Sequence, residues 1–169
     1  MKTSFLISGI LLIIGVWSIS DACNKADALF KIERSKNGNV VQYDACLQED
    51  GALDSDPVSA YWVLEGGRQE DLNLLEKQSA YGIKLEQRIG RDKVQISLAA
   101  LENRKLVVEK KDGKYKAVLS IGGKESVLEK VFVKSDERSL GSPKVLYIDL
   151  FGRSLADDAP VQEHIVPKG

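Results

Sequence analysis

Cationic and amide side chains gather in one short stretch of the chain, FKIERSKNGNVVQYDA. Arg34 and Lys36 are cations, and Asn37 and Asn39 carry amides that both donate and accept hydrogen bonds. Such groups, held together, can bind a carboxylate, a phosphate or a sugar. Asn-Gly is a strong hairpin signal because both residues accept positive φ. Asn37-Gly38 is therefore predicted to form a turn that presents these groups at a sheet edge.

Aromatic rings offer a second part of such a site. The segment SAYWV places Tyr61 next to Trp62, and neighbouring residues of a strand point to opposite faces. At least one of the two rings is expected in the core, and Tyr43 and Tyr81 are further candidates for packing or stacking. The predicted ligand-binding site consists of Arg34, Lys36, Asn37, Asn39, Tyr61 and Trp62.

The acidic stretch EDGALDSDP offers three carboxylates at Asp50, Asp54 and Asp56. Calcium takes six or more oxygen ligands from a flexible loop, so these residues are weak candidates for a calcium site. Their spacing fits no EF-hand loop, and a solvated acidic turn before Pro57 is the alternative.

No motif assigns a catalytic residue. His164 is the single histidine, and no G-x-S-x-G motif accompanies it, so an edge-strand or surface histidine is expected. One histidine and two cysteines do not support a zinc site, and no cofactor is predicted. Paired carboxylates for glycoside hydrolysis remain open, because sequence spacing does not reveal their separation in space.

The charge balance argues against nucleic acid as a partner. The chain has 24 Lys and Arg against 25 Asp and Glu, which gives a net charge of −1. No segment forms a basic stripe with interleaved aromatic residues, which nucleic-acid-binding proteins use.

The N-terminus predicts export. Lys2 precedes the apolar run Phe5–Ile19, and the small residues of SDAC follow, as in a secretory signal. The apolar run is shorter than the roughly 20 residues of a spanning helix, which disfavours an uncleaved anchor. We therefore expect a signal segment over 1–22, a tether over 23–28, and a single β domain over 29–169. The exported protein is expected in the periplasm or cell envelope, with or without a lipid anchor, or else secreted.

Two fates of Cys23 follow from this signal. An ordinary signal peptidase reads Ser20 and Ala22 and releases a chain that starts at Cys23. A lipoprotein signal also ends on a cysteine, and a lipid on Cys23 would attach the protein to a membrane. If Cys23 stays unmodified, a disulfide to Cys46 would close a loop of about 24 residues, worth on the order of 3 kcal/mol.

The remaining chain is typical of antiparallel strands. In KLVVEKKDGKYKAVLSIGGKESVLEKVFV, the pairs Asp112-Gly113 and Gly122-Gly123 predict turns of a three-strand meander. Further strands are expected at 29–34, 40–47, 59–64, 83–89, 93–98 and 144–151, and one principal helix near Glu70 to Tyr81, with Gly82 as its stop. The fold class is mainly β, an antiparallel sandwich or partly closed barrel with one α-helix.

Several segments resemble a known family. The stretches FKIERSKNGNVVQYDA, PVSAYWV, KQSAYGI, LSIGG and VLYIDLFGRSL resemble DUF4833, a bacterial family of exported proteins of unknown function, over about Leu29 to Pro167. The resemblance implies a single domain in an envelope setting. It brings no activity and no catalytic residue.

Three classes of function follow. The first is a non-enzymatic envelope protein that binds a partner protein or a small polar ligand. The second is an exported hydrolase with paired carboxylates, and the third is a purely structural lipoprotein. Because nucleophile, metal and nucleotide motifs are absent from the sequence, the first and third are favoured over an enzyme.

Overall fold

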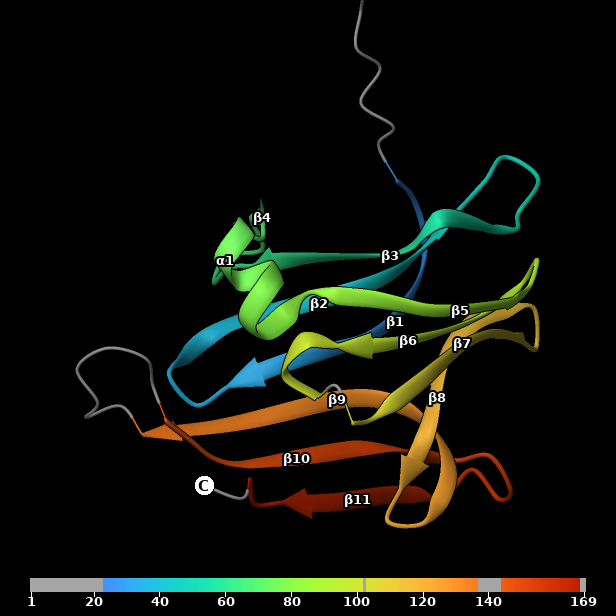
Figure 1. The fold of residues 1–169 in the computed structure, drawn as a ribbon. Helices are drawn as coiled ribbons and strands as arrows, with labels where there is room; N and C mark the ends of the chain where they lie inside the picture. The colour runs from blue at the N-terminus through green and yellow to red at the C-terminus, as the bar shows by residue number, and fades with distance from the viewer. Residues whose placement is uncertain (1–22, 102, 137–143, 168–169) are drawn as a thin grey trace, which may run out of the picture.

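The computed structural model describes residues 23–101, 103–136 and 144–167, so the predicted signal segment lies outside the described residues. Strands dominate and form one curled sheet, a half-barrel, with one short helix (Figure 1), which confirms the mainly-β prediction. The strands are β1 (Asn24–Arg34), β2 (Asn37–Leu47), β3 (Leu53–Val63), β4 (Gln69–Asp71), β5 (Ile83–Gly90), β6 (Lys93–Leu98), β7 (Lys105–Lys111), β8 (Lys114–Ile121), β9 (Lys124–Asp136), β10 (Lys144–Ser154) and β11 (Pro160–Ile165). The helical segments are α1 (Leu74–Glu76), η1 (Lys77–Tyr81) and η2 (Ala99–Leu101).

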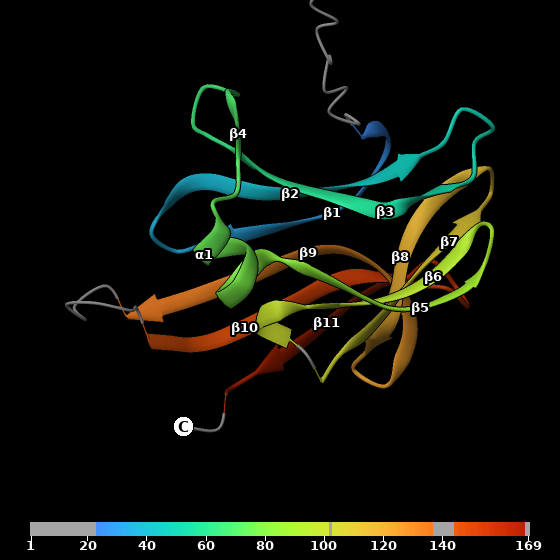
Figure 2. The same cartoon turned by 45° about the horizontal axis from the view of Figure 1, so that its top comes forward.

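Strand β9 is the branch point of the sheet. Its first residues pair with β8, its later residues pair in parallel with β1, and β10 pairs along most of its length. One arm therefore runs β1-β2-β3-β4, another runs β8-β7-β6-β5, and β10 with β11 forms a third. Figure 2 shows the first two arms curving so that β3 and β5 face each other. All pairings except β1 with β9 are antiparallel.

The core follows the predicted alternation of side chains. In β8, the residues predicted to share a face are buried: Tyr115, Ala117, Leu119 and Ile121. In β2, Val41, Tyr43 and Ala45 are fully buried in the same core, and Asp44 and Cys46 on the other face are buried too. Alternate burial within a strand is the pattern of a sheet that packs one face on a core.

Two predicted turns of the meander are confirmed. Asp112 and Gly113 have φ of 51° and 80°, and Gly122 and Gly123 have φ of 58° and 83°. Positive φ at both central residues matches the right-handed twist of the flanking strands. The turns therefore join β7, β8 and β9 as expected.

The predicted Asn37-Gly38 turn is wrong. Arg34 pairs with Asn37, so Ser35 and Lys36 are the turn residues, and Asn37 begins β2. Gly38 has no positive φ; its amide instead donates to Glu65 Oε1 at 2.8 Å, and an added Cβ would lie 2.9 Å from that oxygen. Contact with a loop far along the chain thus extends β2 to the asparagines.

The predicted helix near Glu70 to Tyr81 begins later than expected. Residues Gln69–Asp71 form β4, which pairs with the end of β3. Asn73 caps the helix, because its side chain accepts from the Glu76 amide and the Glu76 carboxylate accepts from the Asn73 amide. This capping box sets the start, and the π-helical turn η1 completes the segment. No helix among the described residues is long and apolar enough to cross a membrane.

The predicted tether over 23–28 is also wrong, because β1 begins at Asn24. Asn24 and Lys25 pair with Leu47 and Cys46, and Ala28 pairs with Asp44. Cys23 and Cys46 form a disulfide, with their Cα atoms 5.3 Å apart. The bond fastens the start of β1 to the end of β2, and its sulfur cannot at the same time carry a thioether-linked lipid.

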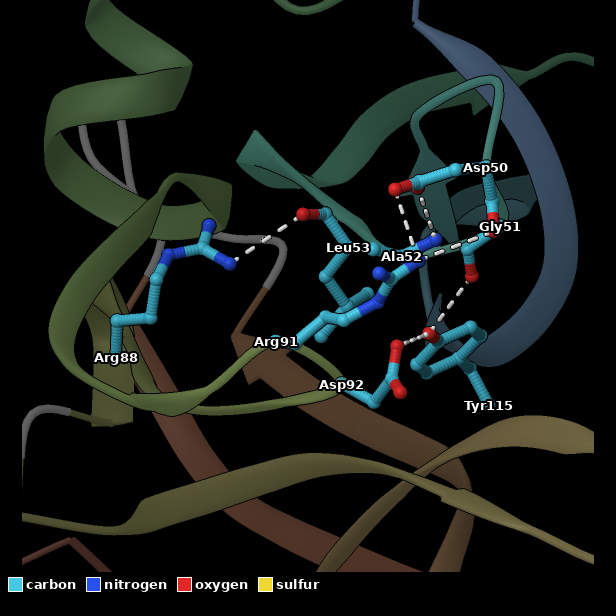
Figure 3. Close-up of polar contacts among 8 residues, drawn as sticks. All are labelled: Asp50, Gly51, Ala52, Leu53, Arg88, Arg91, Asp92 and Tyr115. Carbon is cyan, nitrogen blue, oxygen red and sulfur yellow. Dashed lines mark hydrogen bonds and ion pairs between the residues drawn. The ribbon is translucent and has the colours of Figure 1, made fainter.

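A polar cluster joins the two facing arms at one end (Figure 3). Arg91 pairs with the Asp50 carboxylate at 2.8 Å, and the Leu53 amide donates to the Arg91 carbonyl at 3.3 Å. The Tyr115 hydroxyl lies 2.6 Å from Asp92 Oδ1 and 3.0 Å from the Gly51 carbonyl. We call this cluster the clasp: Asp50, Gly51, Ala52, Leu53, Arg88, Arg91, Asp92 and Tyr115.

Candidate functional site

Three of the predicted ligand-binding residues meet where β1 turns into β2. The Arg34 guanidinium lies over the Trp62 ring, 4.4 Å from its centroid. Arg34 Nη2 donates to Asn37 Oδ1 at 3.4 Å, and Nη1 donates to the Tyr81 hydroxyl at 3.5 Å. We use the name Arg34 pocket for this cluster of four contacting side chains: Arg34, Asn37, Trp62 and Tyr81.

Tyr81 belongs to this pocket, although the predicted site omitted it. Its ring packs edge-on against Trp62 with centroids 5.2 Å apart, and its carbonyl accepts from the Tyr43 hydroxyl at 2.8 Å. Burial raises the pKa of that Tyr43 hydroxyl, so it stays a donor. The sequence placed Tyr81 at the end of the predicted helix. It did not indicate that this end would contact Trp62 on β3 and Arg34 on β1.

The Arg34 guanidinium is incompletely paired. Its Nε is buried and has no hydrogen-bond partner. Within the described parts of the chain, no ion pair joins Arg34 to a carboxylate. The Arg34 guanidinium therefore has N–H donors that no described carboxylate binds.

The other predicted site residues lie elsewhere or serve other contacts. Lys36 is exposed in the turn, and Asn39 Oδ1 accepts from the Glu65 amide at 3.0 Å. Tyr61 is buried on the opposite face of β3 from Trp62, and its hydroxyl lies 2.5 Å from Asp44 Oδ2. Desolvation, followed by the Asp44 hydrogen bond, raises the pKa of Tyr61 to about 12.

A groove lies between β3 and β5, where the two arms face each other. It has a volume of about 490 Å³. One wall is the edge of β3 over residues 56–60, the other is the start of β5 over residues 83–85, and the Cys23–Cys46 disulfide lies beside them. The connection from β4 to β5 adds Asp71, Leu72, Lys77 and Gly82 to the lining. We call it the β3–β5 groove.

One exposed leucine lines this groove, and others lie on the elements next to it. Leu85 lines it and is 42% exposed, and Leu74 and Leu75 on α1 are each 71% exposed. Ile89, further along β5, is 49% exposed. Leu85 therefore offers an exposed apolar contact inside the groove.

The predicted calcium candidates do not come together. Asp50 belongs to the clasp, Asp54 accepts from the Ser55 amide and hydroxyl, and Asp56 lines the β3–β5 groove. Among the described residues, no group of three or more acidic, histidine or cysteine side chains is placed to hold a metal ion.

His164 lies on β11, and its position agrees with the edge-strand expectation. Its Nδ1 lies 2.7 Å from Asp149 Oδ1, and its ring is 4.8 Å from Tyr147. No nucleophilic side chain is bonded to this pair within the described residues. The carboxyl groups with resolved shifts, Glu33, Glu86, Glu109, Asp157 and Glu163, all have a pKa below the ordinary value. A glycosidase acid instead needs a raised pKa.

Comparison with known proteins supports the resemblance seen in the sequence. The family described as a domain of unknown function (DUF4833) matches residues 30–164, which is most of the chain. No curated protein and no solved structure matches. The matched range contains the Arg34 pocket and most of the β3–β5 groove. Because the match covers most of its length, the chain belongs to the DUF4833 family.

Proposed function

We propose that the protein is a non-enzymatic interaction module of the cell envelope that holds an extended segment of a partner protein in the β3–β5 groove. The observation that carries this proposal is that two sheet edges face each other across the groove without pairing. An unpaired edge offers amide and carbonyl groups that an added strand can bind.

Strand β5 is the edge that receives the partner. On β3, Pro57 lacks an amide hydrogen, and Arg88 donates to the carbonyls of Leu53, Asp54 and Ser55. Proline and charged side chains protect an edge from further pairing. The start of β5, residues 83–85, lies opposite and has no such cover among the contacts of the described residues.

The chemistry of the groove favours an amphipathic partner segment. Its lining includes the apolar residues Val58, Ala60, Leu72, Ile83 and Leu85. Asp56, Asp71 and Lys77 add charge of both signs along the groove. Alternate residues of an extended segment point to opposite sides, so one set would contact this apolar lining and the other would face water.

The disulfide supports the exported setting of this proposal. Disulfides persist in oxidising compartments such as the periplasm and are rare in the cytosol. The hydrolase alternative has less support, because the carboxyl groups with resolved pKa shifts are held ionised by their cationic or hydrogen-bonding partners.

Selection from a random-peptide library on phage tests the proposal. We expect peptides with alternating apolar residues that protect from hydrogen exchange those amides of residues 83–85 that β6 does not already bind. Leu85→Lys should weaken their binding at least tenfold, because a charge would face the apolar lining. Leu146→Lys is the matched control, since Leu146 is also 42% exposed but lies on β10.

The two variants decide the result together. Loss of binding with Leu85→Lys but not with Leu146→Lys supports the groove. Selected peptides that bind both variants equally, or that protect amides elsewhere, overturn it.

A further inference from the structure

We propose that the Arg34 pocket binds an oxyanion, the carboxylate or phosphate group of a small ligand. This site is separate from the β3–β5 groove, because none of its four residues lines that groove. The test of this proposal is therefore independent of the test of the peptide-binding function.

Unused donors on Arg34 favour an oxyanion ligand. A guanidinium carries five N–H groups. Arg34 makes contacts at 3.4 Å and 3.5 Å, which are longer than ordinary N–H···O bonds, and its Nε makes none. The buried Nε is out of a ligand's reach, but an oxyanion at the two terminal nitrogens would give them shorter, charge-assisted hydrogen bonds than their present contacts.

The pocket also lacks a counter-ion of its own. Arginines that serve only structure at a core boundary are commonly paired with a carboxylate. The carboxylate of Glu65 lies near this turn, but it accepts from the Gly38 amide at 2.8 Å and forms no ion pair with Arg34. Among the described residues, therefore, the negative charge that Arg34 would attract is not supplied by the protein.

The stacked guanidinium of Arg34 suits a planar or tetrahedral anion. Trp62 supports one face of the planar guanidinium, which fixes the direction of its donors. A fixed fork of this kind matches the two oxygens of a carboxylate or phosphate. The Tyr81 hydroxyl accepts from Nη1 and can donate its own hydrogen to the same oxyanion, whereas the Asn37 Oδ1 atom beside Nη2 only accepts and would have to give way.

Trp62 also provides the readout. The chain has two tryptophans, Trp17 and Trp62, so a full chain with Trp17→Phe reports on the pocket alone. We would titrate it with acetate and, separately, with inorganic phosphate, at an ionic strength held constant with sodium chloride. We expect a saturable change in Trp62 fluorescence with a dissociation constant in the millimolar range or below.

Variants separate binding from folding. Arg34→Lys keeps the charge but loses the fork, and should raise the dissociation constant at least tenfold. Tyr81→Phe keeps the ring against Trp62 and removes the hydroxyl, and should raise it a few-fold at an unchanged melting temperature. Arg153→Lys, an exposed arginine on β10, is the control and should change nothing.

Each outcome decides the proposal. Saturation by acetate alone identifies a carboxylate site, by phosphate alone a phosphate site, and either supports the inference. A linear response to both anions, equal to that of chloride, overturns it. If Arg34→Lys does not fold, the folded Tyr81→Phe variant decides: unchanged binding overturns the inference, and weakened binding supports it.

Discussion

At the residue scale, two arginines at the ends of strands show opposite degrees of pairing. Arg34 has long contacts and a buried Nε without a partner. Arg104 instead forms a two-point ion pair with Glu163, and the Gly122 amide donates to the same carboxylate at 2.8 Å. Arg104 is therefore a structural link between the start of β7 and β11, whereas the terminal nitrogens of Arg34 make only long contacts.

The Glu163 pair makes stability depend on pH. The Arg104 hydrogen bond, followed by the Gly122 amide, lowers the pKa of Glu163 from its ordinary value of 4.5. A lowered pKa in the folded state adds stability that is present above the ordinary value and is lost as pH falls through the folded value. Glu163→Gln should therefore cost about 1 kcal/mol in free energy of unfolding at neutral pH.

Urea unfolding of Glu163→Gln at neutral pH and at about pH 3 checks this, because the carboxyl group of the unfolded chain is largely protonated at the lower value. The difference from the native chain should shrink at low pH. Glu129→Gln is the control, since Glu129 and its partner Arg153 have side chains about half exposed, at 53% and 49%. A difference for Glu163→Gln that is equally large at both pH values contradicts the prediction.

At the element scale, Gly82 decides how the helical segment joins β5. Its place after the predicted helix favours a helix stop, which usually requires positive φ. Its φ is −66°, and its role is close packing: an added Cβ would lie 1.8 Å from the Lys77 carbonyl oxygen. Gly82→Ala must therefore shift the backbone of η1 or of β5.

We expect Gly82→Ala to lower the free energy of unfolding by roughly 2 kcal/mol, as overpacking does. Gly90→Ala, at the other end of β5, is the matched control because a Cβ added there would have no neighbour within 4 Å. Its effect should be within about 0.5 kcal/mol of zero. Thermal and urea unfolding of both variants measure the difference, and equal stabilities would show that η1 adjusts freely.

At the scale of the whole molecule, long-range links hold the curled sheet together. The disulfide joins β1 to β2 across a sequence separation of 23 residues, and the clasp joins the β2–β3 loop to the β5–β6 turn. Cys46→Ser and Cys23→Ser should each cost about 3 kcal/mol of stability, and the double variant should cost no more than either alone.

Mass spectrometry of the exported protein completes this prediction. We expect a chain that begins at Cys23 and has the mass of the oxidised cysteine pair. An acyl mass on Cys23 and a free thiol at Cys46 would contradict the disulfide and identify a lipoprotein. Additive losses of stability in the double variant would show that the two sulfurs act separately.

The sequence by itself determined the local features of this protein. Turns such as Asp112-Gly113 and the alternation of Tyr115, Ala117 and Leu119 depend on neighbouring residues, so they were predictable. The capping box of Asn73 and Glu76 was also present in the sequence and would have corrected the helix start.

Only the tertiary structure decided which distant residues meet. The position of the β1–β2 turn depends on Glu65, and the start of β1 depends on its pairing with β2. Trp62 and Tyr81 reach Arg34 because the sheet curls and brings β3 beside the helical segment. Side-chain alternation assigns a residue to a face of its own strand, but it contains no information on which other strand that face will meet.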